Sequence, residues 1–169
     1  MKRSGPIKRK PTKEREPKLN RLGNPVCSVN RKRSKHSNGP ARSLQGGPYL
    51  CASHAEERAD RLFSKWVRAR DGRCTIAPVV HTPCDDFPLQ ACHIEGRRKQ
   101  VLRYSPANVH AGCRTHHRLV DEHEATIKVD WALHVLGDLQ YRELRVRARQ
   151  TANRLDAALS ALAWLEGEK

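Results

Sequence analysis

Apolar residues recur with helical spacing in the stretch ASHAEERADRLFSKWVRARDG, which begins at residue 52. Their intervals of three and four residues predict an amphipathic helix that ends at Gly72. Ser53 and Glu56 have the spacing of a capping box at its start. Trp66 lies on the apolar side of this helix, so we expect it to be part of the core and not a stacking platform for bases.

A second amphipathic pattern occupies the C-terminal stretch, residues 138–169. It predicts one long helix, whose apolar stripe is formed by Leu144, Ala148, Ala152, Leu155, Leu159 and Leu162. Four arginines fall outside this stripe and make the exposed side of the helix basic: Arg145, Arg147, Arg149 and Arg154.

The middle of the chain predicts shorter elements. The segments CTIAPVV and LQACHI suit the two strands of a hairpin, and a loop follows at residues 95–107. CRTHHRLVDEHEA predicts a second helix, and VDWALHVLG predicts a third one that ends at Gly137. The expected fold is therefore a small α+β core over residues 52–137 with flanking helices.

The first 51 residues show neither a helical nor a strand period. They are rich in Pro, Gly, Ser, Asn, Lys and Arg, and they hold too few apolar side chains to offset the entropy of ordering the chain. We therefore expect residues 1–51 to form a disordered basic tail, in which Cys27 and Cys51 have no structural role.

Charge changes this picture by indicating a polyanionic partner. The 169-residue chain has 33 Lys and Arg against 18 Asp and Glu, a formal charge of +15, and residues 1–50 hold 14 basic and 2 acidic side chains. No amphipathic apolar face accompanies the basic run, so nucleic acid is favoured over a lipid surface. A tail that only solubilises the protein is the alternative. The tail cations expected to contact phosphates are Lys8, Arg9, Lys10, Arg31, Lys32 and Arg33.

Location is constrained by what the chain lacks. It has no run of about 18 apolar residues, which a membrane span needs, and no apolar segment follows its basic start as in a secretory signal. We expect a cytoplasmic protein without a membrane partner, in a bacterial host cell if a phage encodes it. Cysteines in that compartment are more typical of metal ligands than of disulfides.

Four residues have the chemistry of a structural zinc site. Only eight residues are aromatic, so the core is small and a metal staple would stabilise it. Cys74 and Cys84 come from a turn-rich stretch, and Cys113 and His116 have the two-residue gap that lets one loop hold a metal with two ligands. Three thiolates and an imidazole are an ordinary closed zinc set.

Histidines remain after that set is closed. His93 ends the expected second strand, and His117 directly follows the zinc ligand. Asp121 lies four residues after His117 on the same helix, so the two side chains can share a face, while His123 lies six residues after it. A second divalent ion held by His117 with Asp121 or His123, and with His93 nearby, would make a hydrolytic site.

These residues resemble the ββα-metal, or HNH, endonucleases. The resemblance covers about 50 residues, from RARDGRC at 68–74 through ACHIEGRR and SPANV to CRTHHR at 113–118. It implies a zinc-stapled ββα core. The most similar members are phage and prophage HNH proteins, including recombination-associated nucleases of the NinG kind, which share a basic start like MKRSGPIKRK.

The resemblance also implies roles for individual residues. His93 would be the general base that activates water, and Asn108 would hold the loop and help to orient His93. His117 would bind a catalytic Mg²⁺ or Mn²⁺, with Asp121 or His123 as a further ligand.

Two positions depart from the family pattern. Many members have Asp or His immediately before the base histidine, where this chain has Cys92, a softer ligand than magnesium or manganese favours. Members with a similar histidine pair often have a further histidine at the position that Asp121 occupies here. Cys92 either points away, alters the metal preference or competes for zinc.

The expected function is hydrolysis of phosphodiester bonds in DNA, as a nickase or as a nuclease on single-stranded or branched DNA, with little sequence specificity. A recombination protein is an expected partner. Arg97, Arg98 and Lys99 follow the base histidine and could contact the phosphates beside the cut. The alternative is a zinc-stapled DNA-binding module without catalysis, which would not need His93, Asn108 and His117 together.

Overall fold

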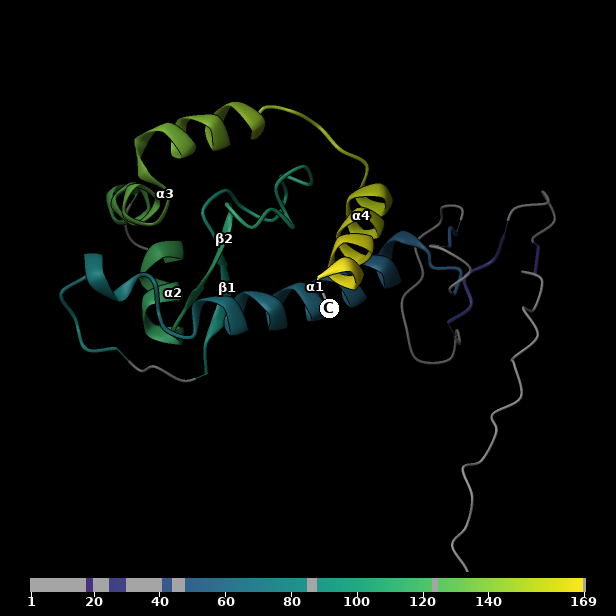
Figure 1. The fold of residues 1–169 in the computed structure, drawn as a ribbon, viewed down its shortest axis with the longest axis horizontal. Helices are drawn as coiled ribbons and strands as arrows, with labels where there is room; N and C mark the ends of the chain where they lie inside the picture. The colour runs from purple at the N-terminus through teal and green to yellow at the C-terminus, as the bar shows by residue number, and fades with distance from the viewer. Residues whose placement is uncertain are drawn as a thin grey trace, which may run out of the picture.

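The computed structural model describes residues 18–19, 25–29, 41–43, 48–84, 88–122 and 125–168. Within these ranges the chain is α+β, with helices surrounding a two-stranded sheet (Figure 1). The elements in order are α1 (Ala52–Asp71), the 3-10 turn η1 (Ala77–Val79), β1 (Gln90–His93), β2 (Val109–Gly112), α2 (Arg114–Glu122), α3 (Ala125–Arg147) and α4 (Arg154–Gly167).

The two strands form an antiparallel hairpin in the middle of the molecule. Gln90 pairs with Gly112 and His93 pairs with Val109, so the long loop leaves and returns at the His93 end. Helix α1 packs against both strands, and α2 contacts β1 (Figure 1). Because a loop joins the two strands and α2 follows β2 directly, the last residue of β1, the first residue of β2 and the start of α2 all belong to this one hairpin and its exit.

The predicted strand CTIAPVV is wrong. This segment contains η1, and Pro78 lies at its start. Strand β1 pairs instead with Val109–Gly112. Proline has no N–H to donate to a sheet and its fixed φ suits the first turn of a helix, which explains the preference for η1. Thr75 hydrogen-bonds to the sheet from outside it, donating from both its N–H and its hydroxyl to the Ala111 carbonyl at 2.8 and 2.9 Å.

Helix α1 confirms its predicted end but not its predicted cap. Gly72 closes it in the left-handed region at φ 64°, which glycine adopts without strain. Cys51, and not Ser53, is the N-cap residue, and its side chain makes no capping hydrogen bond. Glu56 is buried and accepts hydrogen bonds from Arg103 at 3.2 Å and Arg154 at 2.9 Å, so it ties the helix to distant segments instead.

The single C-terminal helix that the apolar stripe predicts is divided. The kink at Gly137, where φ is 72°, lies where the preceding helix was predicted to end. The break falls between Arg147 and Arg154: α4 begins anew after Asn153, whose Oδ1 accepts from the Leu155 N–H at 2.8 Å. The stripe serves two separate cores, which is the physical reason for the break. Leu144 packs in the larger cluster, with Trp131 and the hairpin, while Leu155 packs in a smaller cluster between α1 and α4.

Parts of the N-terminal segment are held in place, and the prediction of a structureless tail does not hold for them. Arg42 and Leu50 exchange two backbone hydrogen bonds, and the Ser28 N–H donates to the Tyr49 carbonyl at 2.7 Å. Leu50 also joins the smaller cluster. The other positions of the tail, including the six basic residues expected to contact phosphates, lie outside the described residues.

Trp66 is half-buried, packs against the larger cluster and meets Trp164 edge to face with 4.8 Å between ring centroids. Its place against the core is as predicted. In the part of the chain that the structure describes, no helix combines the length and the apolar character that crossing a membrane requires.

Gly112 is a position where the hairpin tolerates no side chain. A Cβ atom there would lie 2.7 Å from both Cys92 Sγ and Ile76 Cδ1. We expect Gly112→Ala to lower the free energy of unfolding by about 1–3 kcal/mol, the usual cost of overpacking, measured by urea denaturation. Gly96→Ala is the matched control, because a Cβ at Gly96 would meet nothing within 4 Å. Equal destabilisation by both variants would contradict this account.

Candidate functional site

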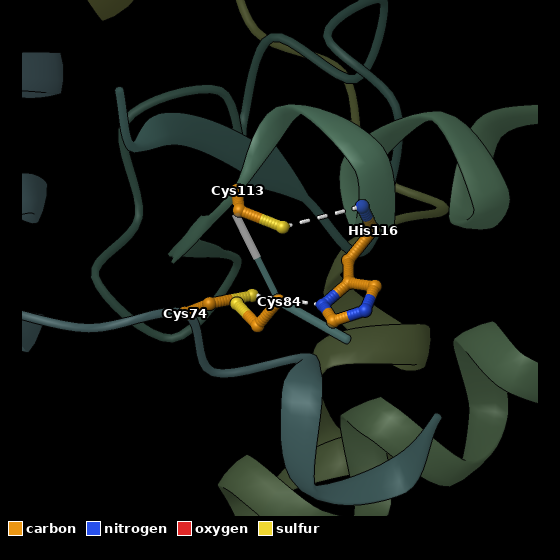
Figure 2. A group of neighbouring side chains, drawn as sticks. All are labelled: Cys74, Cys84, Cys113 and His116. Atoms are coloured by element: carbon orange, nitrogen blue, oxygen red, sulfur yellow. Dashed lines mark hydrogen bonds between the residues drawn. The ribbon is translucent and has the colours of Figure 1, made fainter. Parts of the chain in front are cut away.

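Cys74, Cys84, Cys113 and His116 form one compact group, as their sequence pattern predicts (Figure 2). One ligand atom from each lies within 4.8 Å of the others, and all but Cys84 are buried. They come from the segment after α1, the loop after η1, the end of β2 and the first turn of α2. Four ligands around one zinc ion lie about 3.5–4 Å apart, so this group could hold a structural metal with little movement.

The orientation of His116 suits a ligand that binds through Nδ1. Its Nδ1 lies 3.4 Å from Cys74 Sγ, while its Nε2 lies 2.9 Å from the hydroxyl of Thr82. Metal-binding histidines usually donate their other N–H to an oxygen, which holds the ring in one tautomer. The Cys113 Sγ accepts from the His116 backbone N–H at 3.4 Å. Sequence reasoning did not identify Thr82, and no sequence signal marks it.

A second group of metal-ligand atoms was missed by the sequence analysis. Cys27, Cys51 and His54 also bring one ligand atom each within 4.8 Å of the others. The prediction that Cys27 and Cys51 are structurally idle is therefore wrong. The signal was present, because Cys51 and His54 have the same two-residue gap as Cys113 and His116.

His93 lies at the wall of a cavity of about 480 Å³ between β1 and α1. Its Nε2 is 3.1 Å from the Arg103 carbonyl oxygen, which can only accept, so Nε2 carries the hydrogen and Nδ1 keeps its lone pair. Burial, with a smaller contribution from the positive charge of Arg97, lowers the pKa of His93 to about 4. The imidazole is therefore neutral at neutral pH and able to accept a proton at Nδ1.

The same cavity is rich in guanidinium groups. Its lining includes four arginines, Arg61, Arg68, Arg97 and Arg103, against two carboxylates, Glu57 and Asp60. Arg103 is held by Asp60 at 2.7 Å and by Glu56 at 3.2 Å, so it is a fixed part of the wall. Sequence reasoning identified only Arg97 among these four, because the others lie on α1 or late in the loop.

Asn108 holds the loop that leads from His93 back to β2. It is fully buried, and its Oδ1 accepts from the Glu95 N–H at 2.7 Å while its Nδ2 donates to the Glu95 and Leu102 carbonyls at 2.9 and 3.0 Å. Its backbone carbonyl also accepts from the Ile94 N–H at 2.9 Å. These bonds fix the chain on the C-terminal side of His93.

The end of α1 fixes the other side of this loop. Arg70 donates to the carbonyls of Pro106 at 2.9 Å and Val109 at 2.8 Å, and Asp71 accepts from the Ala111 N–H at 2.6 Å. The RARDG segment thus connects the end of α1 to β2 and to the loop before it. The sequence pattern predicted the helix end but not these contacts.

His117 makes a pair with Asp121 on α2. Its Nε2 lies 3.2 Å from Asp121 Oδ2, and its Nδ1 lies 2.7 Å from Gln90 Oε1, which can only accept. Nδ1 therefore carries a hydrogen, and Nε2 faces the carboxylate. Burial lowers the pKa of His117, and Asp121 opposes that shift. His123, the other candidate ligand, lies outside the described residues.

His93 and His117 lie on opposite faces of the hairpin, because successive side chains of a strand alternate. Gln90 contacts His117 and so faces α2, whereas Ala91 and His93 line the cavity beside α1. Arg97 connects the two sides electrostatically, since its charge lowers the pKa of both histidines.

Cys92 faces α2 and is fully buried, with its Sγ packed toward the Gly112 backbone. Burial raises the pKa of the Cys92 thiol, and nearby Cys74 and Asp121 raise it further. A neutral thiol is a poor ligand for a hard divalent ion. Among the described residues Cys92 belongs to neither compact ligand group.

The loop cations predicted to contact phosphates are at the surface. Arg97, Arg98 and Lys99 are all exposed, directly after the end of β1. Arg145 lies nearby as well, because it pairs with Glu95 at 2.9 Å. The four arginines outside the C-terminal stripe are exposed, as predicted.

Comparison with known proteins gives no relative: no family model matches the chain, and no curated protein or solved structure does so either. Any assignment of function therefore depends on the chemistry of the residues described above.

Proposed function

We propose that this protein is a metal-dependent endonuclease of the ββα-metal (HNH) type that hydrolyses phosphodiester bonds in DNA. The observation that carries the proposal is the placement of His93: a neutral imidazole at the end of β1, oriented by a backbone carbonyl and facing an arginine-lined cavity. A base that accepts a proton beside groups that bind phosphate is the minimum that such hydrolysis requires.

His93 would act through Nδ1, taking a proton from the attacking water. Asn108 would act through the loop, keeping the residues after His93 in place, so it is a positioning residue. Because the charge of Arg97 acts on both His93 and His117, a phosphate bound by Arg97 would lie near both histidines.

His117 and Asp121 would hold the divalent ion, Mg²⁺ or Mn²⁺, with His123 as a further candidate. Two ligand atoms of one such ion lie about 3 Å apart, and the 3.2 Å between His117 Nε2 and Asp121 Oδ2 fits that spacing. When bound, the ion would offset negative charge on the scissile phosphate and the leaving oxygen. Cys92 fits poorly as a ligand because its thiol is kept neutral.

The surface charge favours affinity for phosphates over recognition of bases, so we propose little sequence specificity. Arg97 lines the cavity, the exposed Arg98 and Lys99 follow it in the loop, and the basic tail would add sequence-independent attraction. Action on single-stranded or branched DNA, with a recombination protein as partner and in phage or prophage DNA processing, is the setting that we propose. The competing proposal is a zinc-stapled DNA-binding protein without catalysis.

The test is cutting of supercoiled, single-stranded and branched DNA by the purified protein, with Mg²⁺ or Mn²⁺ added or omitted. We expect cutting by the wild type that depends on the added ion. His117→Ala should cut at least about tenfold more slowly, because the ion loses a ligand. His134→Ala is the matched control, since His134 is exposed on α3 far along the chain from the hairpin.

DNA binding without cutting, by wild type and both variants alike, would favour the binding-module alternative. Cutting that is equally fast in His117→Ala and wild type would contradict the assignment of the ion to α2. Zinc content is measured in each preparation, because His117 adjoins the proposed structural ligand His116. A variant that loses zinc would be inactive through loss of structure and not through loss of the catalytic ion.

A further inference from the structure

We propose that Cys27, Cys51 and His54 form a second zinc site, which clips the N-terminal segment onto the start of α1. The three ligand atoms already lie close: His54 Nδ1 is 3.2 Å from Cys27 Sγ and 3.1 Å from Cys51 Sγ. Two thiolates and an imidazole are borderline and soft donors of the kind that zinc selects over magnesium or calcium.

Cys51 and His54 repeat the local geometry of Cys113 and His116 in the first site. In both, a cysteine directly precedes a helix and a histidine follows three residues later: Cys51 and His54 at α1, Cys113 and His116 at α2. The residue after each histidine donates its N–H to the carbonyl of that cysteine, at 2.9 Å in both cases. Both histidines turn Nδ1 toward sulfur. The first turn of α1 therefore presents ligands as the first turn of α2 does.

The site is largely shielded from solvent. Cys51 and His54 are buried and Cys27 is half-buried, so a bound ion would be shielded from competing water. A cavity of about 450 Å³, lined in part by His54, Ser28 and Leu50, adjoins the site and gives an incoming ion or a fourth ligand a route.

A staple would add to the modest contacts that hold the described residues of this segment. They are backbone hydrogen bonds such as those between Arg42 and Leu50, an ion pair between Arg42 and Asp156, and the packing of Leu50 and Val29 in the smaller apolar cluster. A zinc ion here would stabilise the segment in the way that metals stabilise other small folds. The two sites would flank α1, one before it and one after it, separated by about 30 Å of helix. The second site would thereby fix the strongly basic stretch around Cys27 to the helix that carries Arg61 and Arg68.

The experiment counts zinc in the full-length protein, purified under reducing conditions with Zn²⁺ supplied and then freed of loosely held ions. We expect two zinc ions per wild-type chain and one in Cys27→Ser. Cys92→Ala is the matched control and should keep both, because Cys92 is a buried thiol outside both groups. Amide hydrogen exchange of Ser28, Arg42 and Leu50 should quicken in Cys27→Ser, while the amides of β1 and β2 stay as protected as in the wild type.

A single zinc ion in both wild type and Cys27→Ser would overturn the proposal, as would two in both. A disulfide between Cys27 and Cys51 is the competing outcome. In protein purified without reductant and then unfolded, it would leave four free thiols, where the proposal expects six. His54→Gln serves as a second variant, and its zinc count should also fall to one. None of these results depends on whether the protein cuts DNA.

Discussion

Cys113→Ser is expected to lose one equivalent of zinc relative to the wild type and to unfold the hairpin with α2. Cys113 is fully buried where β2 meets α2, and two of its partners, Cys74 and Cys84, come from an earlier segment, so a metal here would connect parts of the chain that are far apart in sequence. Structural zinc contributes about 10–16 kcal/mol in small metal-dependent folds, which equals or exceeds the roughly 5–15 kcal/mol stability of a whole domain.

Loss of this staple should be visible in the near-ultraviolet circular dichroism of Trp131. That indole is fully buried, and its Nε1 donates to the Thr75 hydroxyl at 3.0 Å, one residue from the ligand Cys74. Cys92→Ala is again the control, since it removes a fully buried thiol from the same hairpin without removing a ligand of this group. If Cys113→Ser keeps its zinc and its thermal midpoint, the four-residue group is not a metal site.

His93→Ala is expected to slow DNA cutting by about 10²–10⁴-fold, the usual contribution of a general base. The expectation rests on the proposed nuclease function. The cost in stability should be small, since the side chain makes one hydrogen bond, to the Arg103 carbonyl, worth about 1 kcal/mol. Rates are measured on plasmid with Mg²⁺ or Mn²⁺, beside zinc content and urea denaturation of each variant.

His110→Ala provides a closely matched comparison for that measurement. His110 is also half-buried on the hairpin, also approaches a backbone carbonyl, that of Ala107 at 3.3 Å, and also has a pKa lowered by burial. It does not line the arginine-rich cavity. A rate as low in His110→Ala as in His93→Ala would indicate a general loss of hairpin structure and not the loss of a base. Equal rates in His93→Ala and wild type would remove His93 from the mechanism.

Local patterns predicted the parts of this protein that depend on neighbours in sequence. Helix α1 ends at Gly72 as expected, because the left-handed conformation there is a property of one residue. The group around Cys113 and His116 was predictable because a two-residue gap at a helix start brings two ligands together wherever the rest of the chain runs. The expectation that Asp121 shares a face with His117 also follows from helix geometry alone.

Pairings between distant segments were not predictable in the same way. The hairpin prediction chose the wrong partner for β1, since CTIAPVV and VHAG are both short apolar runs and only one of them contains a proline. The continuous apolar stripe of the C-terminal region concealed a break, because its residues pack into two different clusters. Gln90, which orients His117, has no sequence signal, since its contact depends on the register of β1 against α2.

By itself, then, the sequence determined the α+β class, the basic surface, the main Cys/His group and the histidines around the hairpin. Those features follow from composition and from spacing within one turn or loop. The tertiary structure alone decided that His93 faces α1 while His117 faces α2, that four arginines converge on His93, and that Cys27 meets Cys51 and His54. The reason is physical: which face a strand residue occupies and which distant segments meet depend on packing of the whole core, and no local pattern carries that information.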